Sequence, residues 1–336
     1  MKNQLRNTLL ALVLLSSASV HALAPIPDKN GITGFVALGL GFADVESNFL
    51  AEAVGQDLGD KNISSLGSPE GESIGLPVAA FELSYVFNGK TQLYLGNLLE
   101  DYLRFDFATR FGVRHNVGKA GRVGFSILQS PITAKVWKDP YATGVDRESM
   151  DRDTKGFRVS WDEIFGSGLE IRFASRELEL DDEQSGTSFL IDPDEIASLD
   201  RNGDYTQANI RYQLSKNETN QFILGVNGRE GDADGSAMDW SSTSIELDYI
   251  YTPSKDLKVV TILVVGSRDF DEINPVFGQK TDSDFTAFTV TGFFPGMFGF
   301  KDWTANAALV IGQEDSDVDF FDQNMSMLSF GFLHKF

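Results

Sequence analysis

The sequence of 336 residues contains no cysteine, and this absence excludes several classes of protein. No disulfide can form, so an exported chain has to draw its stability from the fold itself. Lipid attachment through an N-terminal cysteine is excluded, and so is catalysis by a thiolate nucleophile.

The sequence also lacks long apolar runs and an excess of positive charge. A transmembrane helix needs roughly 18 uninterrupted apolar residues, and the longest candidate, Leu257–Gly266, is broken by Lys258 and Thr261. Lys and Arg number 28 against 49 Asp and Glu, which gives a net charge of −21. This charge repels phosphate groups, so a nucleic-acid partner is not expected.

The N-terminus has the layout of a secretory signal peptide. Basic residues precede the short apolar run Leu9–Leu15, and small residues around Ala22 provide a cleavage site. Cleavage after Ala22 gives a signal peptide over residues 1–22 and a mature chain over residues 23–336. No linker or change of composition divides the mature chain, which predicts a single domain.

Past this leader the sequence repeats one pattern, in which about ten residues of alternating polarity are followed by turn residues. In Leu103–Arg114, most of the odd-numbered positions are apolar. The charged residues Arg104, Asp106, Arg110 and Arg114 lie at even-numbered positions. Tyr205–Leu214 and Thr243–Tyr251 repeat this alternation. The pattern is typical of a transmembrane β-barrel, although a soluble sandwich shows the same period.

The sequence therefore predicts an all-β fold, a transmembrane antiparallel barrel of the bacterial outer membrane with about 14 strands. About 12 is the alternative, because the third and sixth strands are short. The predicted strands are Gly34–Glu46, Val78–Phe87, Thr91–Asn97, Leu103–Arg114, Arg122–Trp137, Gly156–Trp161, Leu169–Leu180, Tyr205–Leu214, Gln221–Arg229, Ser242–Tyr251, Leu257–Ser267, Asp284–Phe294, Trp303–Gln313 and Asn324–Phe336. Pro131 falls within the fifth strand and predicts a bulge or an early end there.

The connections distinguish a barrel from a sandwich. Those after even-numbered strands are short, whereas most of those after odd-numbered strands are long, such as Ser47–Pro77, Lys138–Lys155 and Asp181–Asp204. Leu98–Tyr102 is the exception. Short periplasmic turns alternating with long external loops are typical of an outer-membrane barrel. The longest loop, Ser47–Pro77, is a candidate to fold inward as a plug.

Aromatic residues support the same topology. Trp137 and Trp240 end their predicted strands on the external side, and Trp161 and Trp303 on the periplasmic side, as expected for two interfacial girdles. The final strand ends at Phe336, which resembles the C-terminal signature that the barrel-assembly machinery reads in outer-membrane proteins. The expected partners are this machinery, the lipid bilayer and lipopolysaccharide, and a monomer is expected.

The inner face carries the candidate functional residues. An Arg on the lipid face costs roughly 2–4 kcal/mol at the bilayer midplane, so the charged positions of the strands should face the lumen. Val260, Ile262, Val264, Ala308 and Val310 predict an apolar wall opposite them. The candidates for lining the lumen and setting selectivity are Arg104, Asp106, Arg110, Arg114, Arg172, Arg176, Arg211, Arg229, Glu246 and Asp248.

This lining predicts a porin-like channel or facilitator for small polar, anionic or amphiphilic solutes. The alternative is a closed structural or surface-binding barrel that acts through its acidic external loops. No enzyme is predicted, because His115 and His334 lie near the periplasmic side and cannot serve an external active site. No metal or cofactor is predicted, since Asp200–Asp204 begins like a calcium loop but Tyr205 replaces the required glycine.

Gly31–Ala51 contains the run Gly-Phe-x-x-x-Gly-x-Gly-Phe followed by Glu46, Ser47 and Asn48. This stretch resembles the outer-membrane family known as domain of unknown function 2860, and the ending at Phe336 agrees with it. The resemblance implies an outer-membrane location and a barrel across the mature chain, and it transfers no activity or functional residue. The strand count is also similar to that of fatty-acid-transporter-like barrels and monomeric porins, by analogy of fold alone.

Overall fold

The computed structural model describes residues 26–53, 55–97, 108–130, 134–299 and 301–336. The predicted signal peptide, Arg104, Asp106 and Pro131 lie outside these residues.

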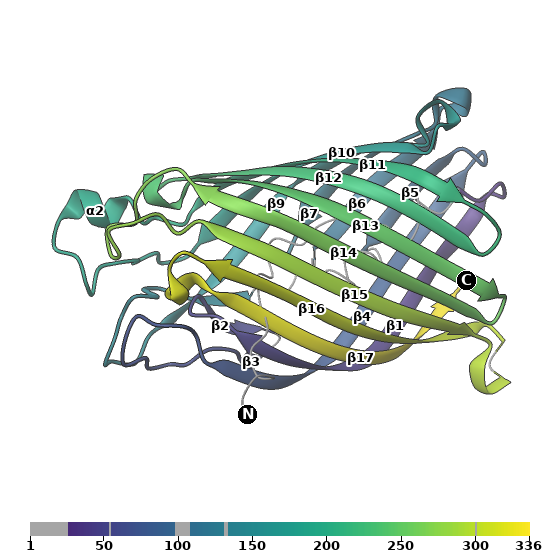
Figure 1. Ribbon diagram of the computed structural model, residues 1–336. Coiled ribbons are helices and arrows are strands. Elements are labelled where there is room, and N and C mark those ends of the chain that lie inside the picture. Colours follow the sequence, from purple (N-terminus) through teal and green to yellow (C-terminus); the bar gives the residue numbers. More distant parts are fainter. Residues whose placement is uncertain (1–25, 54, 98–107, 131–133, 300) are drawn as a thin grey trace.

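The described residues form a closed antiparallel barrel of 14 strands, which confirms the predicted fold (Figure 1). In the wall, β7 and β8 are two parts of one strand, because both pair with β9. Two further short strands, β2 and β3, belong to the first external connection. The wall strands are β1 (Gly31–Glu46), β4 (Gly71–Phe87), β5 (Thr91–Gly96), β6 (Thr109–Asn116), β7 (Arg122–Gln129), β8 (Ala134–Trp137), β9 (Ser149–Asp162), β10 (Leu169–Leu180), β11 (Gly203–Lys216), β12 (Asn220–Ala233), β13 (Trp240–Ser254), β14 (Leu257–Phe270), β15 (Ser283–Pro295), β16 (Trp303–Ser316) and β17 (Gln323–Lys335).

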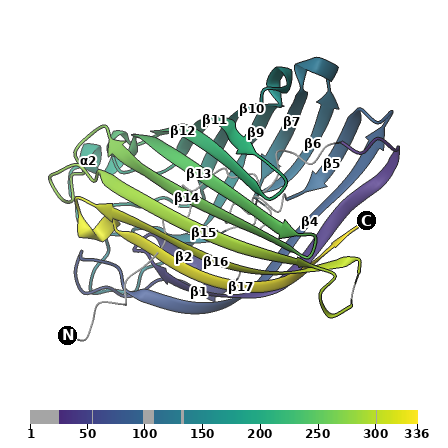
Figure 2. The same ribbon diagram turned by 45° about the vertical axis from the view of Figure 1, so that its right-hand side comes forward.

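The barrel closes where β17 pairs with β1 (Figure 2). At this seam Gly39 lies opposite Gly331. A Cβ built on Gly39 would lie 2.3 Å from the carbonyl oxygen of Phe330, so this close approach requires glycine. Phe336 extends the seam, because its N–H donates to the carbonyl of Gly34 at 3.1 Å and its own carbonyl accepts from Gly34 at 3.0 Å.

Large apolar side chains cover the outside of the barrel. Along β1, Leu38, Leu40 and Phe42 face outward, and Phe42 is 64% exposed. The strands from β4 to β17 present similar side chains, among them Phe111, Ile245 and Phe330. An apolar surface of this extent around a closed barrel is stable in lipid and not in water. The protein is therefore a transmembrane β-barrel of the bacterial outer-membrane type.

Most of the connections alternate in length as predicted. One end of the barrel has short turns, and the other end carries the connections that were predicted to be long, 47–70, 138–148, 181–202, 234–239, 271–282 and 317–322 (Figure 1). Of these, 234–239 and 317–322 are no longer than the longest turns at the opposite end. All six of these loops are shorter than predicted. The first two shorten most, because β4 begins at Gly71 and β9 at Ser149. Both strands continue outward past the apolar belt, where water-exposed polar side chains hide the alternation.

The first external connection contains β2 (Leu50–Ala53) and β3 (Gln56–Asp57), and β2 pairs with the edge of β8. The third long connection contains the α-helix α2 (Pro193–Ala197), whose first turn is capped by Asp192 accepting from the N–H of Asp194 at 3.0 Å. Among the described residues, no helix is long and apolar enough to cross a membrane. Short 3-10 helices occupy η1 (Gly118–Ala120), η2 (Ile164–Gly166), η3 (Ser236–Met238), η4 (Met297–Gly299) and η5 (Asp319–Phe321).

Candidate functional site

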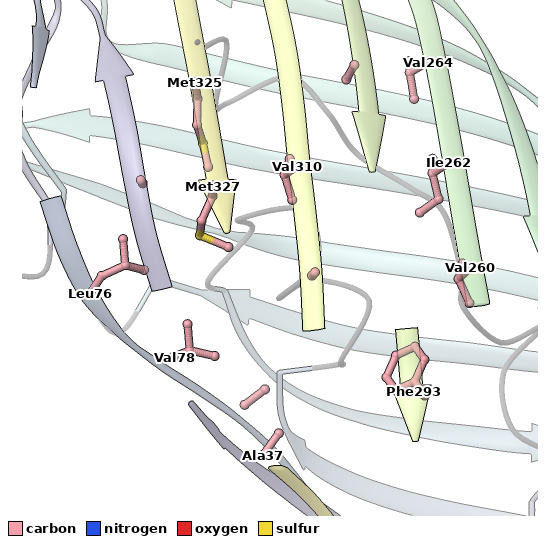
Figure 3. Packing of buried hydrophobic residues seen from close by; sticks show 14 of the residues in the cluster. Ala37, Leu76, Val78, Val260, Ile262, Val264, Phe293, Val310, Met325 and Met327 are labelled. Carbon is pink, nitrogen blue, oxygen red and sulfur yellow. The ribbon is translucent and has the colours of Figure 1, made fainter. Parts of the chain in front are cut away.

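The inside of the barrel has two chemically different walls. The apolar wall is formed by β14 to β17, β1 and β4, whose inward side chains pack into one buried cluster. Figure 3 shows Ile262, Val310 and Met327, from β14, β16 and β17, in this cluster. The apolar side chains predicted on the strands now labelled β14 and β16 are all members of it.

The second wall, from β5 to β13, carries most of the charged side chains. At the inward positions of the described strands, arginines outnumber carboxylates. The inward arginines are Arg110, Arg114, Arg122, Arg152, Arg158, Arg172, Arg176, Arg211, Arg229 and Arg268, and the inward carboxylates are Glu82, Asp162, Glu170, Glu246, Asp248 and Glu314. Among the predicted candidates, Arg110, Arg114, Arg172, Arg211, Glu246 and Asp248 are buried, whereas Arg176 and Arg229 are half-buried.

Arg211 on β11 is the centre of a buried ion-pair network. Its side chain is 0% exposed and contacts Glu170 at 3.1 Å, Glu246 at 3.2 Å and Asp248. Arg172 joins through Glu170 at 3.6 Å. The network links β10, β11 and β13, so the predicted inward residues of three strands meet at one point.

A second network joins β4, β5 and β6. Arg114 donates to Glu82 at 2.7 Å and to the side-chain oxygen of Gln92 at 3.3 Å, and its guanidinium lies 4.0 Å above the ring of Tyr94. Gln92 in turn donates to Ser84 at 2.8 Å. Sequence reasoning missed Glu82, although its alternation with the outward Phe81 and Leu83 marks it as an inward residue.

A third buried pair lies near the external end. Arg268 on β14 contacts Glu314 on β16 at 2.9 Å, and Glu314 also accepts from the hydroxyl of Ser283 at 2.6 Å. Arg268 lies over the rings of Trp240 and Phe270, at 5.1 and 6.0 Å from their centroids. The sequence placed Arg268 in a loop, but β14 continues to Phe270.

The four tryptophans do not all form girdles. Trp240 is buried and faces inward, and Trp137 is buried beneath Arg147, whose guanidinium lies 4.5 Å above its ring. The prediction of an external girdle from these two residues is wrong, because both strand ends lie under the external loops and not against lipid. At the opposite end, Trp161 is half-buried and Trp303 is 36% exposed.

The external loops pack together over the mouth of the barrel, and we call this layer the cap. Each long connection contributes an apolar side chain to the cap's core. Phe320 is fully buried, with ring centroids 5.6 Å from Phe49, 5.4 Å from Tyr141 and 5.5 Å from Phe277. These partners follow β1, β8 and β14, so the cap core joins strands on different sides of the barrel.

Polar contacts hold the cap in place. Arg147 donates to the carbonyls of Asn48, Asp60 and Pro140 at 2.9 to 3.1 Å, and burial lowers its pKa to about 10. The hydroxyl of Tyr141 accepts a hydrogen bond from Asn274 at 3.2 Å, and burial raises the pKa of this hydroxyl. The loops therefore form an ordered layer with an apolar core, and not the solvated acidic rim that composition indicates.

A cavity of about 160 Å³ lies directly beneath the cap. Its apolar lining comes from the cap and from the external ends of the strands, and Arg152, Arg201 and Arg268 supply charge. No Asp or Glu is among its lining residues in the described chain. The lining residues are Phe49, Leu50, Val136, Arg152, Leu178, Leu180, Arg201, Tyr205, Ala233, Met238, Trp240, Arg268, Phe270, Phe321 and Gln323.

The part of the chain that the structure describes holds no group of three or more potential metal ligands. In the sequence that begins like a calcium loop, the carboxylate of Asp200 accepts from the N–H and the side-chain amide of Asn202, at 2.9 and 2.8 Å. These two hydrogen bonds stabilise a local turn.

The fold and lining define a membrane barrel with an asymmetric, charged interior. A family model described as "Protein of unknown function (DUF2860)" matches residues 31–335. The chain belongs to this family, which confirms the resemblance seen in the sequence.

No curated protein matches the sequence. Similar solved structures include a Pseudomonas aeruginosa FadL homologue, with a TM-score of 0.46, 10% identity and coverage of 91% of this chain and 90% of that one. The outer membrane channel DcaP of Acinetobacter baumannii has a TM-score of 0.45 and 10% identity, covering 91% and 97% of the two chains. The anion-selective porin from Comamonas acidovorans has a TM-score of 0.39 and 11% identity, covering 92% and 100%.

Proposed function

We propose that this barrel is a channel that passes small polar, anionic or amphiphilic solutes across the outer membrane. The observation that carries the proposal is the division of the lumen into an arginine-rich wall and an apolar wall. An excess of inward arginines gives a positive potential, which raises the local concentration of anions. The opposite wall accommodates the apolar part of an amphiphilic solute.

The charged wall is costly if the barrel is only structural. Burying an ion pair often stabilises a protein no better than apolar side chains of similar volume. In membrane proteins, ionisable residues inside the bilayer commonly mark solute pathways. The networks around Arg114 and Arg211 favour a pathway for this reason.

Selectivity in a planar bilayer under a salt gradient tests this function. We expect a reversal potential that shows anion preference, and a shift towards cations in the double variant Arg110→Gln with Arg172→Gln. The double variant Lys90→Gln with Lys119→Gln is the control, because it removes the same two positive charges from exposed turns outside the lumen. A folded double variant with the same selectivity as the unaltered protein would contradict the role of the arginines.

The cap favours a second candidate, a closed barrel that acts through its external surface. The buried aromatic core around Phe320 joins loops from different sides of the mouth. A closed barrel should stay silent in the bilayer, and loosening the cap should then release a current. Current in the unaltered protein favours the channel.

A further inference from the structure

We propose that the cavity beneath the cap is a binding site for a small organic monocarboxylate whose apolar body is about the size of one aromatic ring. This inference deepens the proposed function and rests on it for the solute's route into the barrel. The observation behind it is an apolar cavity that three guanidinium groups enter and no carboxylate lines, within the described residues.

The volume limits the ligand. An apolar cavity of about 150 Å³ in another protein accepts benzene, and the cavity here measures about 160 Å³. One ring or a short acyl chain therefore fits, whereas a long acyl chain or an oligosaccharide does not.

The lining favours a ring over a chain. Trp240 and Tyr205 lie together in the cavity with their ring centroids 5.7 Å apart, and Phe270 packs in the same cluster. Phe49 and Phe321 add rings from the cap, with centroids 4.9 Å apart. Aromatic ligands gain additional energy from offset or edge-to-face contact with such rings.

Arg268 is the residue placed to receive the carboxylate. Guanidinium has five N–H donors, and a terminal nitrogen of Arg268 contacts Glu314. The Nε of Arg268 is buried and has no acceptor among the described residues. Because Glu314 also receives the hydroxyl of Ser283, an incoming carboxylate can bind Arg268 without leaving Glu314 unpaired.

The other two arginines that line the cavity, Arg152 and Arg201, have different roles. Arg201 donates to Glu183 at 2.9 Å and to the carbonyls of Trp137 and Lys138, at 2.7 and 3.2 Å, so it mainly holds the cap. Arg152 enters the cavity from β9, and its positive charge adds to that of Arg268. The charge of Arg201 is offset by Glu183, so Arg152 and Arg268 are the residues that favour an anion over a neutral or cationic ligand of the same shape.

Calorimetric titration of the folded full-length mature protein in detergent tests the site, with benzoate as the probe. We expect saturable binding, and weaker binding by about tenfold or more for benzyl alcohol, which has the ring and lacks the charge. Acetate, which has the charge and lacks the ring, should bind more weakly as well. Equal binding of benzoate and benzyl alcohol would overturn the role of the arginines.

Variants locate the binding. Arg268→Gln should weaken benzoate binding by about tenfold or more. Lys258→Gln is the matched control at the periplasmic end of the same strand and should bind normally. Ala233→Phe fills the cavity with a ring while keeping every arginine and should abolish binding. If Arg268→Gln does not fold, benzoate binding to Ala233→Phe still tests the site.

The outcomes separate this site from channel function. Benzoate binding without bilayer current retains the site and rejects the channel. Current with no benzoate binding to the folded protein, or unchanged binding in folded Ala233→Phe, overturns the site and leaves the channel standing.

Discussion

Replacing Arg211 by methionine gives the sharpest test of the charged wall. The side chain is fully buried and contacts Glu170, Glu246 and Asp248. The variant leaves these carboxylates without their shared cation in a region of low dielectric constant. Removing one partner of a buried pair costs about 3–5 kcal/mol, and we expect the free energy of unfolding to fall by about this amount.

Urea unfolding of the protein in lipid vesicles, followed by tryptophan fluorescence and heat-modifiable gel mobility, measures this loss. Lys216→Met on the same strand is the control, because its side chain is exposed and its loss should change stability by less than about 0.5 kcal/mol. Adding Glu246→Gln and Asp248→Asn to Arg211→Met should recover part of the stability. A cost below about 1 kcal/mol for Arg211→Met, or a triple variant less stable than the single one, would refute the reasoning.

Three further predictions concern the seam and the cap. Gly39→Ala should prevent the seam from closing, since its Cβ would meet the carbonyl of Phe330 at 2.3 Å; a heat-modifiable barrel in normal yield would disprove this. Phe320→Ala removes the fully buried ring of the cap and should destabilise the cap by about 3–5 kcal/mol, seen as faster loop proteolysis and higher open probability; unchanged proteolysis would contradict the packing. Burial raises the pKa of Asp322 above its ordinary value of 3.8, so the folded cap binds this proton more tightly than the unfolded chain does. The cap therefore gains stability as the pH falls through this raised pKa. Proteolysis should slow as the pH falls through this pKa, and Asp322→Asn should lose part of the pH dependence, because burial also raises the pKa of Asp239; faster cleavage at low pH would reverse the assigned sign.

The barrel could be predicted because the two faces of a membrane strand differ strongly in chemistry. Outward residues such as Phe111 and Ile245 meet lipid, and inward residues such as Arg110 and Glu246 do not, so the period of two persists through the bilayer. The alternation of short and long connections then fixed the orientation of the strands. Neither the alternation of side chains nor the lengths of the connections predicted which residues of neighbouring strands lie opposite each other.

The strand ends were less predictable. Beyond the bilayer both faces of a strand meet water or loops, and the alternation fades. For this reason β4 and β9 begin earlier than predicted, and Arg268 was assigned to a loop although it lies on β14.

The ion pairs and the cap could not be predicted, because both depend on contacts between distant segments. Glu82 and Arg114 are separated by 32 residues in the sequence, and their contact depends on the register of β4, β5 and β6. The core around Phe320 joins side chains from every long loop, none of which has a repeating pattern. Trp240 is an example of a residue misplaced for this reason. Its position at a strand end predicted a girdle, whereas in the structure it lies under the cap and lines the cavity.

The most direct test of the account is the permeation of permanently charged aromatic solutes into vesicles that contain the folded protein. Benzenesulfonate and benzyltrimethylammonium have similar bodies and opposite charges, and neither crosses lipid in a neutral form. The account predicts that benzenesulfonate enters faster, and that the double variant Arg110→Gln with Arg172→Gln reduces this preference. Faster entry of the cation, or no entry of either solute through folded protein, would contradict an anion pathway along the arginine wall.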